Sequence, residues 1–119
     1  MDKHPGITFA RLCMASVFVV MGGYRLWGAY QGIPITGSTL TFSVIELVLG
    51  LLIAIGWRVR VTAALAALLM LADALLSHRF WSLAGAEQGA QLLHFMKNIG
   101  FVGGLLLLSL VAGQPRRRF

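Results

Sequence analysis

The chain has 119 residues, of which 58% are hydrophobic and only 12% are charged. Soluble domains are nearer a quarter charged, so a soluble domain of this size is excluded, and the bilayer must be the solvent for most of the chain. The net charge of +6 does not indicate nucleic-acid binding, because the basic residues lie at the ends of apolar runs, where they orient membrane helices, and not on a soluble face.

Four apolar runs follow one another along the chain, at about residues 7–26, 39–55, 59–77 and 92–112. A helix rises about 1.5 Å per residue, so each run would reach roughly 25–32 Å, near the hydrocarbon thickness of a bilayer. Backbone hydrogen bonds must close within lipid, which requires helices. The runs predict an all-α integral membrane protein, a single domain over residues 1–119 built as an antiparallel bundle of four transmembrane helices.

The first run contains the chain's one cysteine, Cys13. A single thiol cannot form an internal disulfide or a CxxC pair, so Cys13 is interpreted as a packing residue. The run has no clear small-residue cleavage site and three more spans follow it, so we expect a retained helix and not a signal peptide. Arg11, Phe18 and Arg25 recur at intervals of seven and share one face of this helix.

The second run contains the most informative residue, Glu46. A carboxylate at membrane depth is costly, and it indicates a functional site with a partner of opposite charge. We expect that partner to be Lys97 of the last run, within salt-bridge or single-water distance of Glu46. Arg25 and Asn98 should lie close by.

Each of the four predicted helices carries one polar stripe, and we expect the stripes to turn inward. Counted along the helices, the charged residues of these stripes lie in the outer half of the bundle, where two cations balance two carboxylates. A neutral, paired cluster is the arrangement that can persist away from water. The candidate ligand or proton site comprises Arg25, Glu46, Asp73, His78, Trp81, His94, Lys97 and Asn98.

Two interpretations of this cluster stay open. It can act only as structural glue that fixes helix register, or it can bind an anionic or quinone-like ligand or a proton; one pair would suffice for register, which favours the second. His78 and His94 could ligate a haem or a metal, but no ligand spacing supports this. We therefore assign no metal, no catalytic residue and no cofactor within the chain, with quinone as the one candidate from outside, and whether the chain is an enzyme stays open.

The distribution of basic residues predicts that both termini are cytoplasmic. Loops 24–38 and 78–91 should then face outward, and their aromatic residues are typical of an interfacial belt, with an outward-facing site as the alternative. Gly100 and Gly104 form a GxxxG step, which indicates close packing within the bundle or a dimer face. The basic residues on the predicted inner side are Lys3, Arg58, Arg60, Arg116, Arg117 and Arg118, against Arg25 and Arg79 outside.

Several segments together resemble the DoxX family of small bacterial membrane proteins. The resemblance covers about residues 9–110 and implies a four-helix inner-membrane protein, with Glu46, His78, Trp81, Lys97 and Asn98 at the family's polar positions and Arg25 in place of a usual lysine. Some relatives are implicated in linking sulfur compounds to the quinone pool, and others associate with superoxide dismutase and a sulfurtransferase. The segments that carry it are Arg11-Leu12, Gly23-Tyr24-Arg25-Leu26, Gly32-Ile33-Pro34, Ile45-Glu46-Leu47-Val48-Leu49-Gly50, Gly56-Trp57-Arg58-Val59-Arg60, His78-Arg79-Phe80-Trp81 and Phe95-Met96-Lys97-Asn98-Ile99-Gly100.

The resulting expectation is an inner-membrane subunit of a redox or oxidative-stress-linked assembly, with an outer-half pocket for a quinone or a small anionic compound. Its expected partners are membrane lipid, a soluble redox or sulfur-metabolism protein and a second copy of itself, but not nucleic acid. A small proton-coupled transporter is an alternative, although small multidrug-type transporters place their carboxylate in the first helix, which has none here. A membrane anchor for a partner enzyme is the other alternative.

Overall fold

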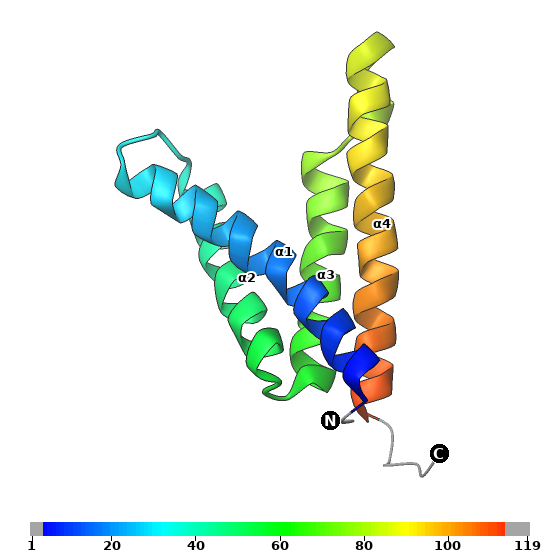
Figure 1. The fold of residues 1–119 in the computed structure, drawn as a ribbon. Coiled ribbons are helices and arrows are strands. Elements are labelled where there is room, and N and C mark those ends of the chain that lie inside the picture. The colour runs from blue at the N-terminus through cyan, green and yellow to red at the C-terminus, as the bar shows by residue number, and fades with distance from the viewer. Residues whose placement is uncertain (1–3, 114–119) are drawn as a thin grey trace.

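The computed structural model describes residues 4–113, and within this part the chain forms an all-α bundle without strands (Figure 1). Each of its four long helices is long and apolar enough to cross a membrane, which confirms the predicted fold class. The basic residues Lys3 and Arg116–Arg118, used above to predict orientation, lie outside the described residues. The elements are α1 (Pro5–Tyr30), α2 (Gly37–Ile55), α3 (Val59–Ser77), the short 3-10 turn η1 (Phe80–Ser82) and α4 (Gly85–Gly113).

The apolar runs predicted both ends of α3 correctly, but they underestimated the lengths of α1 and α4. The last helix begins at Gly85 and not at Leu92, and the first continues to Tyr30 instead of ending at Leu26. The added segment of α4 is polar yet rich in Ala, Glu and Gln, which favour helix, and Glu87 suits the positive end of the helix dipole. Helices extend past the hydrocarbon wherever local propensity allows, which an apolar run does not reveal.

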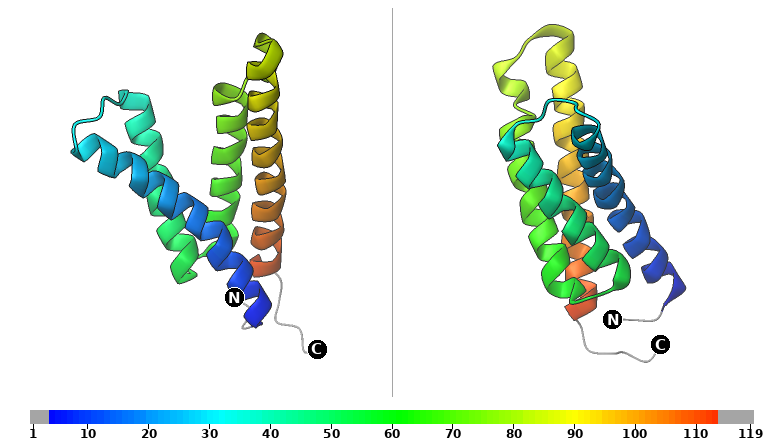
Figure 2. Two further views of the ribbon diagram at one scale, coloured as in Figure 1. Left: turned by 45° about the horizontal axis from the view of Figure 1, so that its top comes forward. Right: turned by 90° about the vertical axis from the view of Figure 1, so that its left-hand side faces the viewer.

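The four helices are arranged as two antiparallel hairpins that diverge. Helix α1 packs along α2, and α3 packs along α4. The two hairpins meet at the end where α1 begins and α4 finishes, and they separate toward the opposite end, where the α1–α2 and α3–α4 connections lie (Figures 1 and 2). We call the joined end the base and the open end the outer end.

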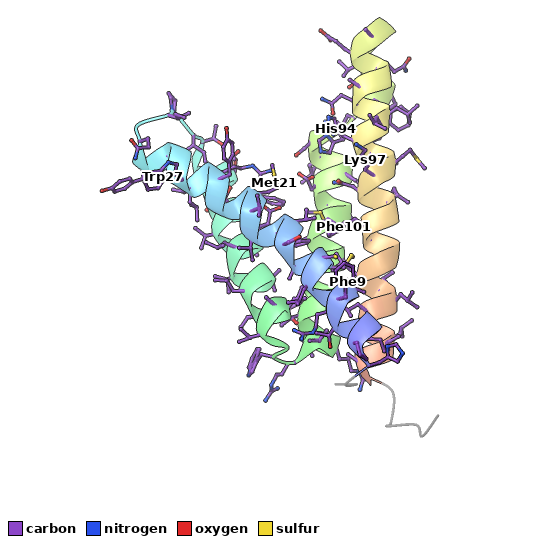
Figure 3. All side chains as sticks on the ribbon, viewed as in Figure 1. Phe9, Met21, Trp27, His94, Lys97 and Phe101 are labelled. Atoms are coloured by element: carbon purple, nitrogen blue, oxygen red, sulfur yellow. The ribbon has the colours of Figure 1, made fainter. Side chains whose placement is uncertain are left out.

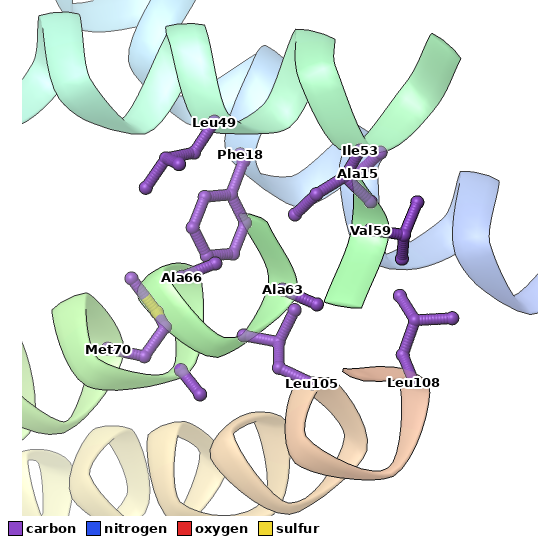
Figure 4. Close-up of a cluster of buried hydrophobic side chains, with 11 residues drawn as sticks. Ala15, Phe18, Leu49, Ile53, Val59, Ala63, Ala66, Met70, Leu105 and Leu108 are labelled. Atoms are coloured by element: carbon purple, nitrogen blue, oxygen red, sulfur yellow. The ribbon is translucent and has the colours of Figure 1, made fainter. Parts of the chain in front are cut away.

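A buried apolar cluster joins the hairpins at the base (Figure 4). The Phe18 side chain of α1 is fully buried and its ring stacks on Phe101 of α4, with centroids 5.5 Å apart. The cluster reaches from the base to the middle of the helices, and within residues 4–113 no such cluster joins the outer ends. The cluster consists of Ala15, Phe18, Leu49, Ile53, Val59, Ala63, Ala66, Ala67, Met70, Leu105 and Leu108.

Two glycines allow α1 and α2 to touch through their backbones. A Cβ atom on Gly50 would lie 2.7 Å from the Cβ of Phe18, and one on Gly22 would lie 2.9 Å from the Ser43 carbonyl oxygen. Small residues at such crossings let membrane helices approach closely. In the predicted GxxxG step, a Cβ at Gly104 would lie 2.9 Å from Met14 of α1, whereas one at Gly100 would meet nothing.

Arg11 of α1 caps the end of α2. Its Nη1 donates to the carbonyl oxygen of Ile53 at 2.8 Å and also to that of Ala54, at a helix end where carbonyls lack intrahelical donors. The Ile53 oxygen accepts from the Gly56 N–H as well. The chain then reverses at Gly56, which has a positive φ of 81°. Arg11 therefore connects the first helix to the turn between the two hairpins.

Candidate functional site

The buried carboxylate of Glu46 pairs with Arg25 and not with Lys97. The Arg25 Nη1 donates to the Glu46 Oε1 at 2.7 Å, with 4% of the Glu46 side chain exposed and 34% of the Arg25 side chain. The expected direct pair with Lys97 is not formed. The physical reason is that Gly22 and Gly50 bring α1 against α2, while Lys97 belongs to the other hairpin.

A second polar network connects α3 and α4. The Asp73 Oδ2 accepts a hydrogen bond from the Asn98 Nδ2 at 2.8 Å and lies 3.3 Å from the His78 Nε2. The other ring nitrogen of His78 shares a hydrogen bond of 2.7 Å with the Gln91 Oε1. Sequence reasoning missed Gln91 because it assigned this residue to a loop; helical continuation of α4 was the signal that could have found it.

The aromatic residues of the second hairpin divide into two groups. The His78 ring stacks on the His94 ring, with centroids 5.2 Å apart, so His94 joins the Asp73 network through His78. Trp81 instead packs edge-on against Phe80 and Phe95, at 5.3 Å and 5.9 Å, and half of its surface is exposed. Within residues 4–113, no group of three or more His, Cys, Asp or Glu side chains is arranged to hold a metal ion.

A hollow of about 420 Å³ lies between the hairpins toward the outer end. Pockets for small molecules are typically about 300–1,000 Å³, so the hollow has room for a ligand of moderate size. A cation from the first hairpin lines it on one side, and a carboxylate and an imidazole from the second hairpin line it on the other. Its lining residues are Arg25, Ser38, Thr39, Phe42, Asp73, Leu76, Ser77 and His78.

Three of the predicted site residues, Arg25, Asp73 and His78, line this hollow directly. Glu46 and Asn98 lie behind them as hydrogen-bond partners. The hydroxyl groups of Ser38 and Thr39 were missed, because they mark the start of a helix: Thr36 caps α2 by accepting from the Thr39 backbone N–H. Ser and Thr at a helix start are usually explained by capping alone. That these two residues lie beside a hollow could be known only from the tertiary structure.

A second hollow, of about 410 Å³, lies within the outer loop of the first hairpin. Tyr24 and Trp27 contribute to its lining together with Arg25, and the Trp27 ring stacks on the ring of Tyr30 at 5.8 Å. Arg25 is the one charged residue among its lining residues. Tyr24 and Trp27, at the outer end of α1, thus border a mostly apolar space next to the Arg25–Glu46 pair.

The chain is similar to the inner membrane protein YphA of Escherichia coli (strain K12), with 26% identity over 113 residues that cover 87% of this chain and 81% of that protein. No protein-family model matches the chain. No solved structure matches it. The similarity to YphA and the four apolar helices together identify a multi-pass inner-membrane protein.

Proposed function

We propose that this inner-membrane protein is DoxX-like and binds a quinone or a small anionic compound in the hollow between its hairpins, as the membrane subunit of a redox or oxidative-stress-linked assembly. The observation that carries the proposal is the composition of the hollow: Arg25 comes from one hairpin, and Asp73 and His78 come from the other. Polar groups from both sides of a cavity can fix the orientation of a bound molecule.

The donors around the hollow suit oxygen-rich ligands. Arg25 presents several N–H groups and uses Nη1 for Glu46, so its other donors can bind an anion or a quinone carbonyl. The hydroxyls of Ser38 and Thr39 supply further donors. Asp73 and His78, which lie 3.3 Å apart, are a pair that can hold the proton that reduction of a quinone oxygen requires.

The direct test is to purify the protein in mild detergent, record its absorbance spectrum and identify the compounds that solvent extracts from it. We expect a quinone or a small anion at a level near one per chain. Thr39→Trp should fill the hollow and abolish this occupancy. Thr41→Trp is the matched control, because Thr41 lies on the same helix and is not among the lining residues of the hollow. Equal ligand content in both variants would contradict the proposal.

A proton-coupled transporter is a second candidate, because the buried Glu46 is paired with a lining residue of the hollow. Intramembrane carboxylates of this kind occur in proton relays. Substrate-driven proton flux in vesicles that Glu46→Gln abolishes would favour the transporter over the redox subunit. A ligand-free protein that co-purifies in equal amount with one soluble enzyme would favour a membrane anchor.

A further inference from the structure

Lys97 is a cation inside the apolar helix α4 that has no partner among residues 4–113. It lies well inside the apolar span Gly85–Ala112, and its side chain is exposed. Within residues 4–113 it forms no ion pair or hydrogen bond, since Glu46 is paired with Arg25 and Asp73 with Asn98 and His78. A charge at membrane depth without a counter-charge is costly, so an anionic partner from outside the described chain would lower that cost.

The register of α4 shows which way Lys97 faces. Residues three, four and seven apart share one face of a helix, so Lys97 shares a face with Phe101 and Gly104. Phe101 stacks on Phe18 of α1, and Gly104 lies against Met14 of α1. Lys97 therefore lies on the face of α4 that meets α1, one turn farther toward the outer end.

The same register identifies what stands across from Lys97. Helices α1 and α4 run antiparallel, and their contacts join Met14 to Gly104 and Phe18 to Phe101. One turn outward, this progression sets Met21 across from Lys97, and the next turn sets Arg25 across from His94. Figure 3 shows Met21 on α1 on the opposite side of the gap from His94 and Lys97 of α4.

Because the hairpins diverge here, the two faces do not close on each other. We define the outer seam as the part of the α1–α4 boundary beyond the Phe18–Phe101 stack. Within residues 4–113 its cations, Lys97 and Arg25, have one carboxylate between them, because Arg25 pairs with Glu46 and Lys97 has no acidic partner. The outer seam is therefore cationic, and toward the base it ends at the buried stack of Phe18 on Phe101.

We propose that the outer seam binds an anionic amphiphile from the membrane, with the acidic head group on Lys97 and the apolar chain along Met21 and the neighbouring lipid. The head group is the phosphate of an acidic phospholipid, which pairs with an ammonium group and is the common anion of a membrane surface. The apolar side chains of Leu93 and Met96 beside Lys97 are exposed, which suits a chain entering sideways. A long lysine stem can raise its charge toward the interface.

The outer seam goes beyond the hollow of the proposed function: the two share Arg25, but Lys97 and Met21, on which the seam proposal is tested, do not line the hollow. The hollow is lined by residues of α2 and α3 together with Arg25, whereas the seam depends on Lys97 of α4. Thr39→Trp should therefore abolish occupancy of the hollow while leaving amphiphile binding at the seam unchanged. The ligand in the hollow and the amphiphile at the seam are therefore tested by different variants, and one proposal can fail while the other holds.

The test is lipid binding in nanodiscs of phosphatidylcholine, to which phosphatidylglycerol or oleate is added in separate titrations, with bound molecules counted by native mass spectrometry. Wild-type protein should retain phosphatidylglycerol saturably, and saturable binding of oleate alone would overturn the assignment of a phospholipid. Lys97→Gln should weaken this binding roughly tenfold, because it removes a charge-assisted hydrogen bond. Lys97→Arg should retain most of it.

Arg79→Gln is the charge-matched control, since Arg79 is an exposed cation at the outer end of the same hairpin. It should change binding by less than about twofold, because Arg79 donates to the Leu75 carbonyl of α3 and is not part of the outer seam. Equal losses in Lys97→Gln and Arg79→Gln, or saturable binding of neither anion, would overturn the proposal.

A steric variant keeps the proposal testable if Lys97→Gln does not fold. Met21→Trp should fill the seam and lower amphiphile binding with the charge of Lys97 intact. Val20→Trp is its control, because the exposed Val20 lies on another face of α1. Unchanged binding in Met21→Trp would overturn the proposal, and loss in Met21→Trp but not in Val20→Trp would support it.

Discussion

At the scale of single residues, the ion pair between Arg25 and Glu46 is asymmetric. Only 4% of the Glu46 side chain is exposed, against 34% of the Arg25 side chain. Removal of one partner of a buried pair leaves an uncompensated charge, which can cost about 3–5 kcal/mol. The carboxylate has no route to water, whereas the guanidinium lines two hollows, so the two single substitutions should not be equivalent.

We expect Arg25→Ala to lower thermal stability in detergent more than Glu46→Ala does, with a loss of about 3 kcal/mol, because it isolates the more buried charge. The double variant Arg25→Ala/Glu46→Ala should be more stable than Arg25→Ala alone. A double-mutant cycle from thermal unfolding measures the coupling. Additive losses in the cycle would mean that the pair contributes no coupling energy.

Arg11 provides a second test at this scale. Arg11→Leu should destabilise the protein by about 1–3 kcal/mol, because it removes the side-chain donor to Ala54 and Ile53 at the end of α2, and the Ile53 carbonyl then keeps the Gly56 N–H. The unfolding midpoint in detergent measures the effect. Arg60→Leu is the control, since the Arg60 side chain is exposed, and it should change the midpoint little. Equal shifts in both variants would argue against the capping role.

At the scale of elements, the backbone contact between α1 and α2 determines which charges meet. The close approach at Gly22 and Gly50 aligns the two helices so that residue 25 of one reaches residue 46 of the other. Sequence reasoning selected the GxxxG step of α4 instead. A glycine pattern within one helix cannot show which neighbour it meets, and these two glycines lie on different helices.

Gly50→Ala should destabilise the first hairpin by about 1–3 kcal/mol, because its Cβ would lie 2.7 Å from the Phe18 Cβ and 2.9 Å from the Val19 backbone nitrogen. Gly103→Ala is the matched control, since a Cβ there meets nothing within 4 Å, and it should be neutral or stabilising. Thermal unfolding measures both variants. If Gly50→Ala left the unfolding midpoint unchanged, α1 and α2 could move apart without loss of stability, and the close contact would not be important.

At the scale of the whole molecule, an even number of spans places the start of α1 and the end of α4 on one side, as Figures 1 and 2 show. The distribution of arginine and lysine predicts that this side is cytoplasmic. Arg58, one of the basic residues on which this prediction rests, lies in the turn between α2 and α3, at the base of the bundle with these helix ends. The outer end, with its hollows and the outer seam, would then face away from the cytoplasm.

Reporter fusions check this orientation. Alkaline phosphatase inserted after residue 33 or residue 84 should be active, because both positions lie in the predicted external loops, and a fluorescent protein at the C-terminus should be fluorescent. An inactive phosphatase at either loop, together with a dark C-terminal fusion, would reverse the assignment. The hollow would then open to the cytoplasm, and a soluble partner would have to be sought there.

The amino-acid sequence by itself determined the membrane environment, the four spans and the residues that bear charge inside them. These follow from composition and from distances along a helix, which are local quantities: the bounds of α3 and the singular position of Glu46 needed no tertiary information. The tertiary structure alone decided which helix faces each charge. Closeness across helices depends on a few backbone contacts, such as those of Gly22 and Gly50, and on the divergence of the hairpins, so Glu46 meets Arg25 while Lys97 is left without a protein partner in the described part of the chain.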